Sequence, residues 1–168
     1  EQNKNALSNV NIIEAEEREM HGISNFQSLP EVIALAEIPV HIYRKEEVLD
    51  SLSLVLNGIQ DPGNLGTILR VADWFGIGNI FCDADCAGVY NPKCVQASMG
   101  AIFRVKTFYT DLPVLLNELK QEGLPVFGTF LDGQNIYTTA LSTRGLIVMG
   151  NEGKGISAEI EALTGPKI

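Results

Sequence analysis

The stretch LSLVLNGIQDPGNLGTILRVADWFGI, residues 52–77, predicts a strand, a turn and a helix in that order. Its first six residues form a nearly continuous apolar run, which is typical of a strand covered on both faces. DPGN at 61–64 has the composition of a turn. Apolar residues then recur at helical spacing, at Leu65, Ile68, Leu69 and Ala72. Gly76 follows them and is suited to a helix C-cap.

The same alternation continues downstream. We expect strands over 79–82, 102–109, 125–130 and 145–150, and helices over 91–100 and 111–123. A further short helix is expected between Ser157 as N-cap and Gly165, and Pro166 then starts an extended segment. Strands that alternate with helical stretches indicate parallel pairing through crossover helices, so we predict an α/β sheet from residue 52 onward.

The first 51 residues follow a different pattern. The apolar run from Val32 to Ile38 predicts a buried strand that Pro39 ends, and residues 11–24 suggest a strand end and a short acidic helix. Residues 43–51 are charged and poor in apolar side chains, which favours a linker. We therefore expect three regions, at residues 1–43, 44–51 and 52–168.

Composition narrows the possible classes of protein. The chain has 168 residues, of which 45% are hydrophobic, and no apolar run approaches the length of a membrane span, so no membrane association is expected. The net charge of −9 lowers the expectation of a nucleic-acid partner. Charges separated by more than roughly 8 Å are largely screened at physiological salt, so a local basic patch remains compatible with RNA.

Three cysteines, Cys82, Cys86 and Cys94, form no paired framework. They favour free thiols in a reducing compartment, and we expect a cytoplasmic protein. Their spacing matches no zinc site and neither histidine lies near them in the sequence, so we expect no metal.

Two loops follow strands and are therefore expected at the carboxyl edge of the sheet, where ligands bind in open α/β folds. They are NGIQDPGN at 57–64 and MGNEGKGIS at 149–157. Neither contains a P-loop or the dinucleotide fingerprint, because Gly155 follows Lys154 where a P-loop needs Ser or Thr. From composition alone, tight turns with no ligand are as good an interpretation as a nucleotide site.

The longer motifs are more specific. NGIQDPGNLGTILRVADWFGI at 57–77 resembles the first signature motif of the SpoU (TrmH-type) RNA ribose methyltransferases, and LIVMGNEGKGIS at 146–157 resembles the second. The resemblance covers the chain from about residue 52, and residues 23–39 resemble the end of that family's substrate-binding domain. It implies the SPOUT fold, a parallel sheet with a C-terminal trefoil knot. It also implies S-adenosylmethionine as methyl donor, a ribose 2′-hydroxyl of rRNA or tRNA as acceptor, and a homodimer.

The resemblance also assigns residues to roles. Gly150, Asn151 and Gly153 are expected to bind the cofactor through bare backbone, together with Thr129 and Leu131 after another strand. Asn64, Arg70 and Glu152 are the catalytic candidates. A guanidinium beside the ribose hydroxyl stabilises a developing alkoxide or holds the neighbouring phosphate, while the proton acceptor stays open.

Simpler interpretations exist for the catalytic candidates. Arg70 is also compatible with an exposed helix arginine, Asn64 with a helix N-cap, and Glu152 with an ion pair to Lys154. The carboxylates Asp83 and Asp85 are expected to be loop residues rather than metal ligands.

The family's third motif is missing, since the chain stops where its next strand would begin. We therefore expect an incomplete knot region and a native chain that continues past Ile168. Three functions are compatible with the sequence: an S-adenosylmethionine-dependent RNA 2′-O-methyltransferase, a non-catalytic RNA-binding member of the same fold, and an unrelated nucleotide-binding α/β protein. The presence of Asn64, Arg70 and Glu152 together favours the enzyme.

Overall fold

The computed structural model of the chain describes residues 10–24 and 28–168. The chain divides into two compact units, Glu1–Pro39 and Val40–Ile168. In the described part of the first unit one helix forms, α1 (Glu17–Ile23). Its start is stabilised by a capping box, in which Glu16 and Glu19 exchange hydrogen bonds between side chain and backbone. The short acidic helix expected before residue 24 is therefore confirmed.

The prediction of a buried strand from Val32 to Ile38 is wrong. These residues form neither helix nor strand, and the Leu35 side chain is 98% exposed. A strand needs a neighbour for its backbone hydrogen bonds, and an apolar side chain is buried only where another element covers it. Apart from α1, the described residues of the first unit provide no such element.

The linker expected over 44–51 also differs from the structure. Residues 45–49 form a short helix, α2 (Lys45–Leu49), and its Val48 is only 1% exposed in the core of the second unit. Lys45 forms ion pairs with Glu118 at 3.0 Å and Glu122 at 2.6 Å. The charged residues therefore attach this segment to the second unit, which the charge pattern alone did not indicate.

The second unit is built on a five-stranded sheet in which all neighbouring strands are parallel, in the order β3-β2-β1-β5-β4. β1 lies at the centre, flanked by β2 and β5. Because every strand runs the same way, the loops that follow β1, β2, β4 and β5 meet at one edge. The strands are β1 (Leu52–Asn57), β2 (Asn79–Cys82), β3 (Lys106–Tyr109), β4 (Val126–Gly128) and β5 (Gly145–Gly150).

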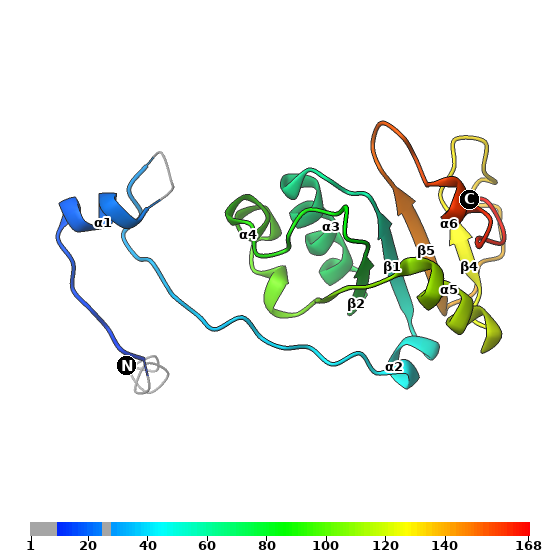
Figure 1. Ribbon diagram of the computed structural model, residues 1–168, viewed down its shortest axis with the longest axis horizontal. Helices are drawn as coiled ribbons and strands as arrows, with labels where there is room; N and C mark the ends of the chain where they lie inside the picture. Colours follow the sequence, from blue (N-terminus) through cyan, green and yellow to red (C-terminus); the bar gives the residue numbers. More distant parts are fainter. Residues whose placement is uncertain (1–9, 25–27) are drawn as a thin grey trace. The chain divides into compact units, whose positions relative to one another are not determined.

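Helices cover both faces of this sheet (Figure 1). On one face lie α3 (Pro62–Trp74) and α4 (Pro92–Ser98), and on the other α5 (Leu112–Gln121) and α6 (Ala158–Glu161). Side chains of β1 alternate between the two cores: Leu54 and Leu56 pack with the α3 and α4 side, and Val55 with the α5 and α6 side. The predicted strand with two covered faces is confirmed, as is the α/β class.

Most predicted element ends agree with the structure. Asn91 and Ser157 accept capping hydrogen bonds at the starts of α4 and α6, and Gly76 follows α3 in the left-handed conformation. Residues 102–109 differ, because a 3₁₀ turn (Ala101–Phe103) precedes the shorter strand β3. None of the helices in the described residues is long and apolar enough to cross a membrane.

Candidate functional site

The loop after β5 closes on itself before α6 begins. Asn151 and Gly155 exchange backbone hydrogen bonds of 3.0 and 2.8 Å, and the Asn151 Oδ1 accepts from the amides of Gly153 at 2.9 Å and Lys154 at 3.1 Å. Gly155 takes a φ of +71°, a left-handed conformation that favours glycine. Asparagine and glycine therefore shape the turn that presents residues 150–156.

The packing of the turn itself requires glycine at position 150. A Cβ at this position would overlap the backbone of Gly155 and Ile156. The space beside Gly150 is thus filled by the backbone at the end of the turn, whereas a Cβ at Gly153 would meet nothing closer than Asn151 Oδ1 at 3.6 Å. Of these two glycines, only Gly153 leaves open space beside it.

The loop after β4 lies on the other side of the site from the turn after β5. Both the backbone amide and the hydroxyl of Thr129 donate to the Val148 carbonyl at 3.0 Å, which ties the loop to β5. The Phe130 amide donates to the Ile168 carbonyl at 2.9 Å, and Leu131 is fully exposed. This loop therefore holds an apolar side chain in solvent beside the turn after β5.

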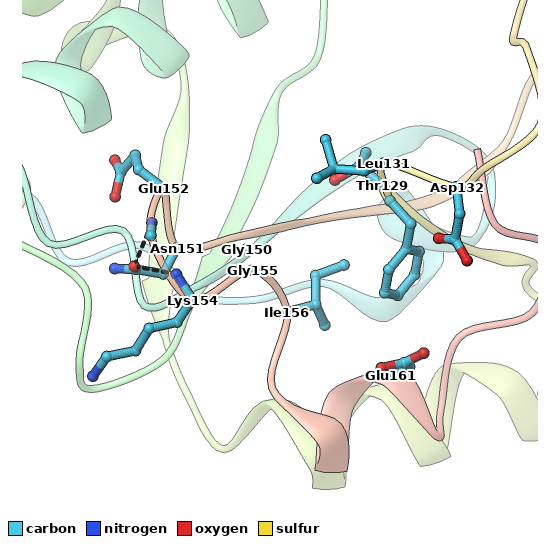
Figure 2. Close-up of a pocket in the computed structure, with 12 residues that line it drawn as sticks. Thr129, Leu131, Asp132, Gly150, Asn151, Glu152, Lys154, Gly155, Ile156 and Glu161 are labelled. Atoms are coloured by element: carbon cyan, nitrogen blue, oxygen red, sulfur yellow. Dashed lines mark hydrogen bonds between the residues drawn. The ribbon is translucent and has the colours of Figure 1, made fainter.

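A pocket of about 660 Å³ lies between the two loops. Figure 2 shows Thr129, Leu131 and Asp132 on one side of it and Asn151, Glu152 and Lys154 on the other, with Glu161 of α6 below. All five residues expected at the cofactor line this pocket, and so does Glu152. The full lining is Thr129, Phe130, Leu131, Asp132, Gly150, Asn151, Glu152, Gly153, Lys154, Gly155, Ile156 and Glu161.

The charge of the pocket lining is mostly negative. Asp132, Glu152 and Glu161 contribute carboxylates, and Lys154 is the basic residue among the lining side chains. Glu161 is paired with Lys167 at 2.7 Å, and the Lys167 ammonium also lies 4.4 Å above the Phe130 ring. The arrangement suits a ligand that carries positive charge and offers hydrogen-bonding groups to backbone.

Two of the three catalytic candidates are in contact. The Asn64 Nδ2 donates to Glu152 Oε1 at 2.7 Å, which joins the first turn of α3 to the pocket loop. The interpretation of Asn64 as helix N-cap is wrong, because Asp61 holds that position and accepts from the Asn64 amide at 3.0 Å. The ammonium of Lys93 and the helix amides lower the pKa of Asp61 below its ordinary value of 3.8.

Arg70 is placed apart from them. It lies on the exposed side of α3, two turns beyond the start of the helix, and outside the set of described residues that line the pocket. The structure thus brings Asn64 and Glu152 to one place and leaves Arg70 on the surface of the same helix.

Several residues of this region carry no signal in the sequence that would predict their place in the site. Phe130, Asp132 and Glu161 line the pocket, but they belong to segments without a sharp motif. Ile156 also lines it and lies within the second motif, where no role was assigned to it. Asp83 lies in the loop after β2, as expected, and it also accepts hydrogen bonds from the Asn57 side chain and the Gly58 amide. A polar Asn at the end of an otherwise apolar strand was the one available signal for that contact.

The three cysteines are free, as expected, with Cys82 at the end of β2 and Cys94 in α4, and all three are buried. Burial raises the pKa of the Cys94 thiol to about 11. A hydrogen bond with Cys86, together with burial, raises the pKa of Cys82. Cys82 and Cys94 are therefore packing residues of the core rather than reactive thiolates.

The model of the SpoU rRNA Methylase family matches residues 51–167. A curated relative, the 23S rRNA (guanosine(2553)-2′-O)-methyltransferase RlmP of Bacillus subtilis, is 30% identical over 80% of this chain and 56% of its own length. The chain thus spans about half the length of the curated relatives it matches.

Solved structures agree in fold. A TrmH-family protein of Porphyromonas gingivalis is 45% identical, with a TM-score of 0.67 over 70% of this chain and 48% of that one. An AdoMet-bound rRNA methyltransferase of Sinorhizobium meliloti is 27% identical, with a TM-score of 0.63 over 70% of this chain and 46% of that one.

Proposed function

Because the chain belongs to the SpoU rRNA Methylase family, we propose that its protein transfers a methyl group from S-adenosylmethionine to a ribose 2′-hydroxyl of structured RNA, either rRNA or tRNA. One observation carries the proposal. The Asn64–Glu152 hydrogen bond joins the two signature motifs beside a pocket that all five expected cofactor residues line. The relatives' names as RNA 2′-O-methyltransferases support the same reaction.

The pocket fits the proposed cofactor in size and charge. Its volume of about 660 Å³ lies within the usual range of small-molecule sites. S-adenosylmethionine supplies a methyl group on a positively charged sulfonium when bound. The carboxylates of Asp132 and Glu152 suit that charge, whereas Glu161 is already paired with Lys167, and Leu131 offers an apolar surface for an adenine ring.

The proposed roles follow from the chemistry of each side chain. Glu152 orients the Asn64 amide, whose carbonyl oxygen stays available to a ribose hydroxyl. Arg70 would hold the phosphate next to that ribose, or stabilise the alkoxide as the hydroxyl loses its proton. A guanidinium keeps its proton in proteins, so Arg70 is not assigned as the base.

We propose a homodimer and a trefoil knot for the full-length protein. Membership of the SpoU family supports the dimer, because the resemblance to that family implies a homodimer. Hydrogen bonds that lay residues 166–168 beside β4 and its loop support the knot: Gly128 donates to Pro166, Ile168 to Gly128, and Gln134 to Lys167. Residues 1–43 are proposed as the end of an RNA substrate-binding domain.

The alternative is a non-catalytic RNA-binding member of the fold, and the separation of Arg70 from the pocket is the observation that favours it. Calorimetry of the full-length protein with S-adenosylmethionine, followed by mass analysis of ribose methylation in rRNA and tRNA, separates the two. Binding and methyl transfer support the enzyme. RNA binding with neither cofactor binding nor transfer supports the alternative, and tight binding of ATP instead of S-adenosylmethionine would contradict both.

A further inference from the structure

The loop that lines the pocket is attached at both of its ends to the end of β1. At the near end, Asn151 Nδ2 donates to the Gly58 carbonyl at 2.7 Å. At the far end, the Ser157 amide, just before α6, donates to Asn57 Oδ1 at 2.7 Å. Two consecutive residues of the chain, Asn57 and Gly58, thus fix where the loop starts and where it stops.

Both anchoring residues are held in position by one carboxylate, which belongs to the residue directly after β2. Asp83, directly after β2, accepts from Asn57 Nδ2 through Oδ2 at 2.6 Å and from the Gly58 amide through Oδ1 at 3.1 Å. The Oδ1 also accepts from the amides of Asp85 at 3.2 Å and Cys86 at 3.1 Å, which fixes the carboxylate itself. Asp83 lies outside the pocket lining among the described residues.

The chemistry of the pair determines the orientation of Asn57. Its Nδ2 must face the Asp83 carboxylate, because a carboxylate only accepts hydrogen bonds. Its Oδ1 then points away from Asp83 and accepts the hydrogen bond from the Ser157 amide. Turning the amide over would set oxygen against oxygen at Asp83 and N–H against N–H at Ser157. The carboxylate of Asp83 therefore sets the position of Ser157 through Asn57.

We propose that Asp83 and Asn57 are positioning residues for the proposed S-adenosylmethionine pocket, acting on cofactor affinity through the loop that Ser157 ends. The inference rests on the proposed function for the identity of the ligand. It predicts that the Asn57–Asp83 pair works as one donor and one acceptor, and that exchanging the two side chains preserves it.

Three variants of the full-length protein test this: Asp83→Asn, Asn57→Asp, and the two combined. In Asp83→Asn the new NH₂ group meets another N–H in either orientation of the amide: the Asn57 Nδ2 in one, and the backbone amides that Asp83 Oδ1 accepts from in the other. Asn57→Asp places two carboxylates in contact. Each single change is expected to weaken S-adenosylmethionine binding about ten- to hundredfold, the usual effect of losing a hydrogen bond to a charged group. The KM for the cofactor should rise more than kcat falls. In the combined variant the amide at 83 donates to the carboxylate at 57, and affinity should return to within about threefold of wild type.

The pH dependence of Asn57→Asp is a readout that general destabilisation would not produce. Two carboxylates in contact raise the pKa of one of them, so a proton bridges the pair at lower pH. The affinity deficit relative to wild type should therefore narrow as the pH falls from about 8 to about 5. Asp85→Asn, an exposed carboxylate two residues away, is the matched control and should bind like wild type.

Amide hydrogen exchange of Ser157 without cofactor keeps this inference separate from the proposed function. Protection in wild type, its loss in both single variants and its return in the combined variant would support the positioning role even if S-adenosylmethionine never binds. The inference is overturned if Asp83→Asn binds and exchanges like wild type, or if the combined variant does no better than the weaker single. The combined variant also stays informative if a single variant fails to fold.

Discussion

The side chain of Asn64 donates a 2.7 Å hydrogen bond to Glu152, a residue 88 positions further along the chain. Asn64 lies in the first turn of α3 and Glu152 in the loop after β5, and β1 and β5 are neighbours in the sheet. The contact therefore joins the start of the helix that follows β1 to the loop that follows β5. The order of the strands reverses between β1 and β5, and open α/β sheets bind ligands at such a place.

A double-mutant cycle on this pair tests whether it acts as a unit. Asn64→Ala and Glu152→Ala in the full-length protein should each lower the single-turnover methyl-transfer rate by about tenfold or more, because each removes a charge-assisted hydrogen bond at the site. The double variant should be about as slow as the slower single, since both changes break the same bond. Asn117→Ala, which loses only a local bond to Pro113 on α5, is the control. Losses that multiply would show independent roles.

Arg70→Ala should fold normally and lose most methyl transfer. Removing one donor that stabilises transition-state charge typically costs about a hundred- to thousandfold in rate. Alanine is the best helix former, and Arg70 is exposed, so the melting temperature should hardly change. Single-turnover kinetics and thermal melts measure the two effects. Arg70→Lys keeps the charge but loses the planar fork and should recover only part of the rate. A near-normal rate in Arg70→Ala would remove this residue from the site.

Gly150→Ala should abolish cofactor binding while leaving the sheet folded. The new Cβ would overlap the backbone of Gly155 and Ile156, so the turn after β5 must open. Gly78→Ala is the control, because nothing lies within 4 Å of a Cβ there and its φ is not left-handed. Calorimetry with S-adenosylmethionine and far-UV circular dichroism provide the readouts. If Gly150→Ala binds with wild-type affinity, the turn does not shape the pocket.

Gly66→Ala should destabilise the protein, although glycine to alanine in a helix normally stabilises it by about 1 kcal/mol. A Cβ on Gly66 of α3 would lie 2.5 Å from the Cys94 carbonyl oxygen and 2.7 Å from Ala97 Cβ, both of α4. Overpacking of this kind costs about 1–3 kcal/mol, because backbone and not a flexible side chain must move. Urea unfolding of the full-length protein measures the change. A variant more stable than wild type would show that α4 moves away freely.

The carboxyl group of Asp61 should titrate below its ordinary value of 3.8. The hydrogen bond from Lys93 and the helix amides favour the charged form, so the capping interaction is present above the unfolded pKa and is lost as the pH falls through the lowered folded pKa. Lys93→Met should raise the pKa of Asp61 towards 3.8. A carbon-detected NMR titration of the side chain reports both values. An unchanged pKa in the variant would assign the shift to the helix amides alone.

Local chemistry in the sequence determined much of the second unit. The apolar run of β1 required two covered faces, Asp111 and Ser157 marked helix starts, and Gly76 marked a helix end. These features depend on residues within a few positions of one another, so they can be predicted from the sequence without knowledge of the fold. The two signature motifs are likewise continuous, and they located Glu152 and the glycine loop at a strand end.

Only the tertiary structure decided which residues meet across the chain. The apolar run at Val32–Ile38 has the composition of a buried strand but lacks a covering element, whereas Val48, in a charged segment, is buried because α2 packs on the second core. Asp83 reaches Asn57 because β1 and β2 end side by side in parallel register. Burial and hydrogen-bond partners depend on which surfaces the topology places face to face, and no local pattern carries that information.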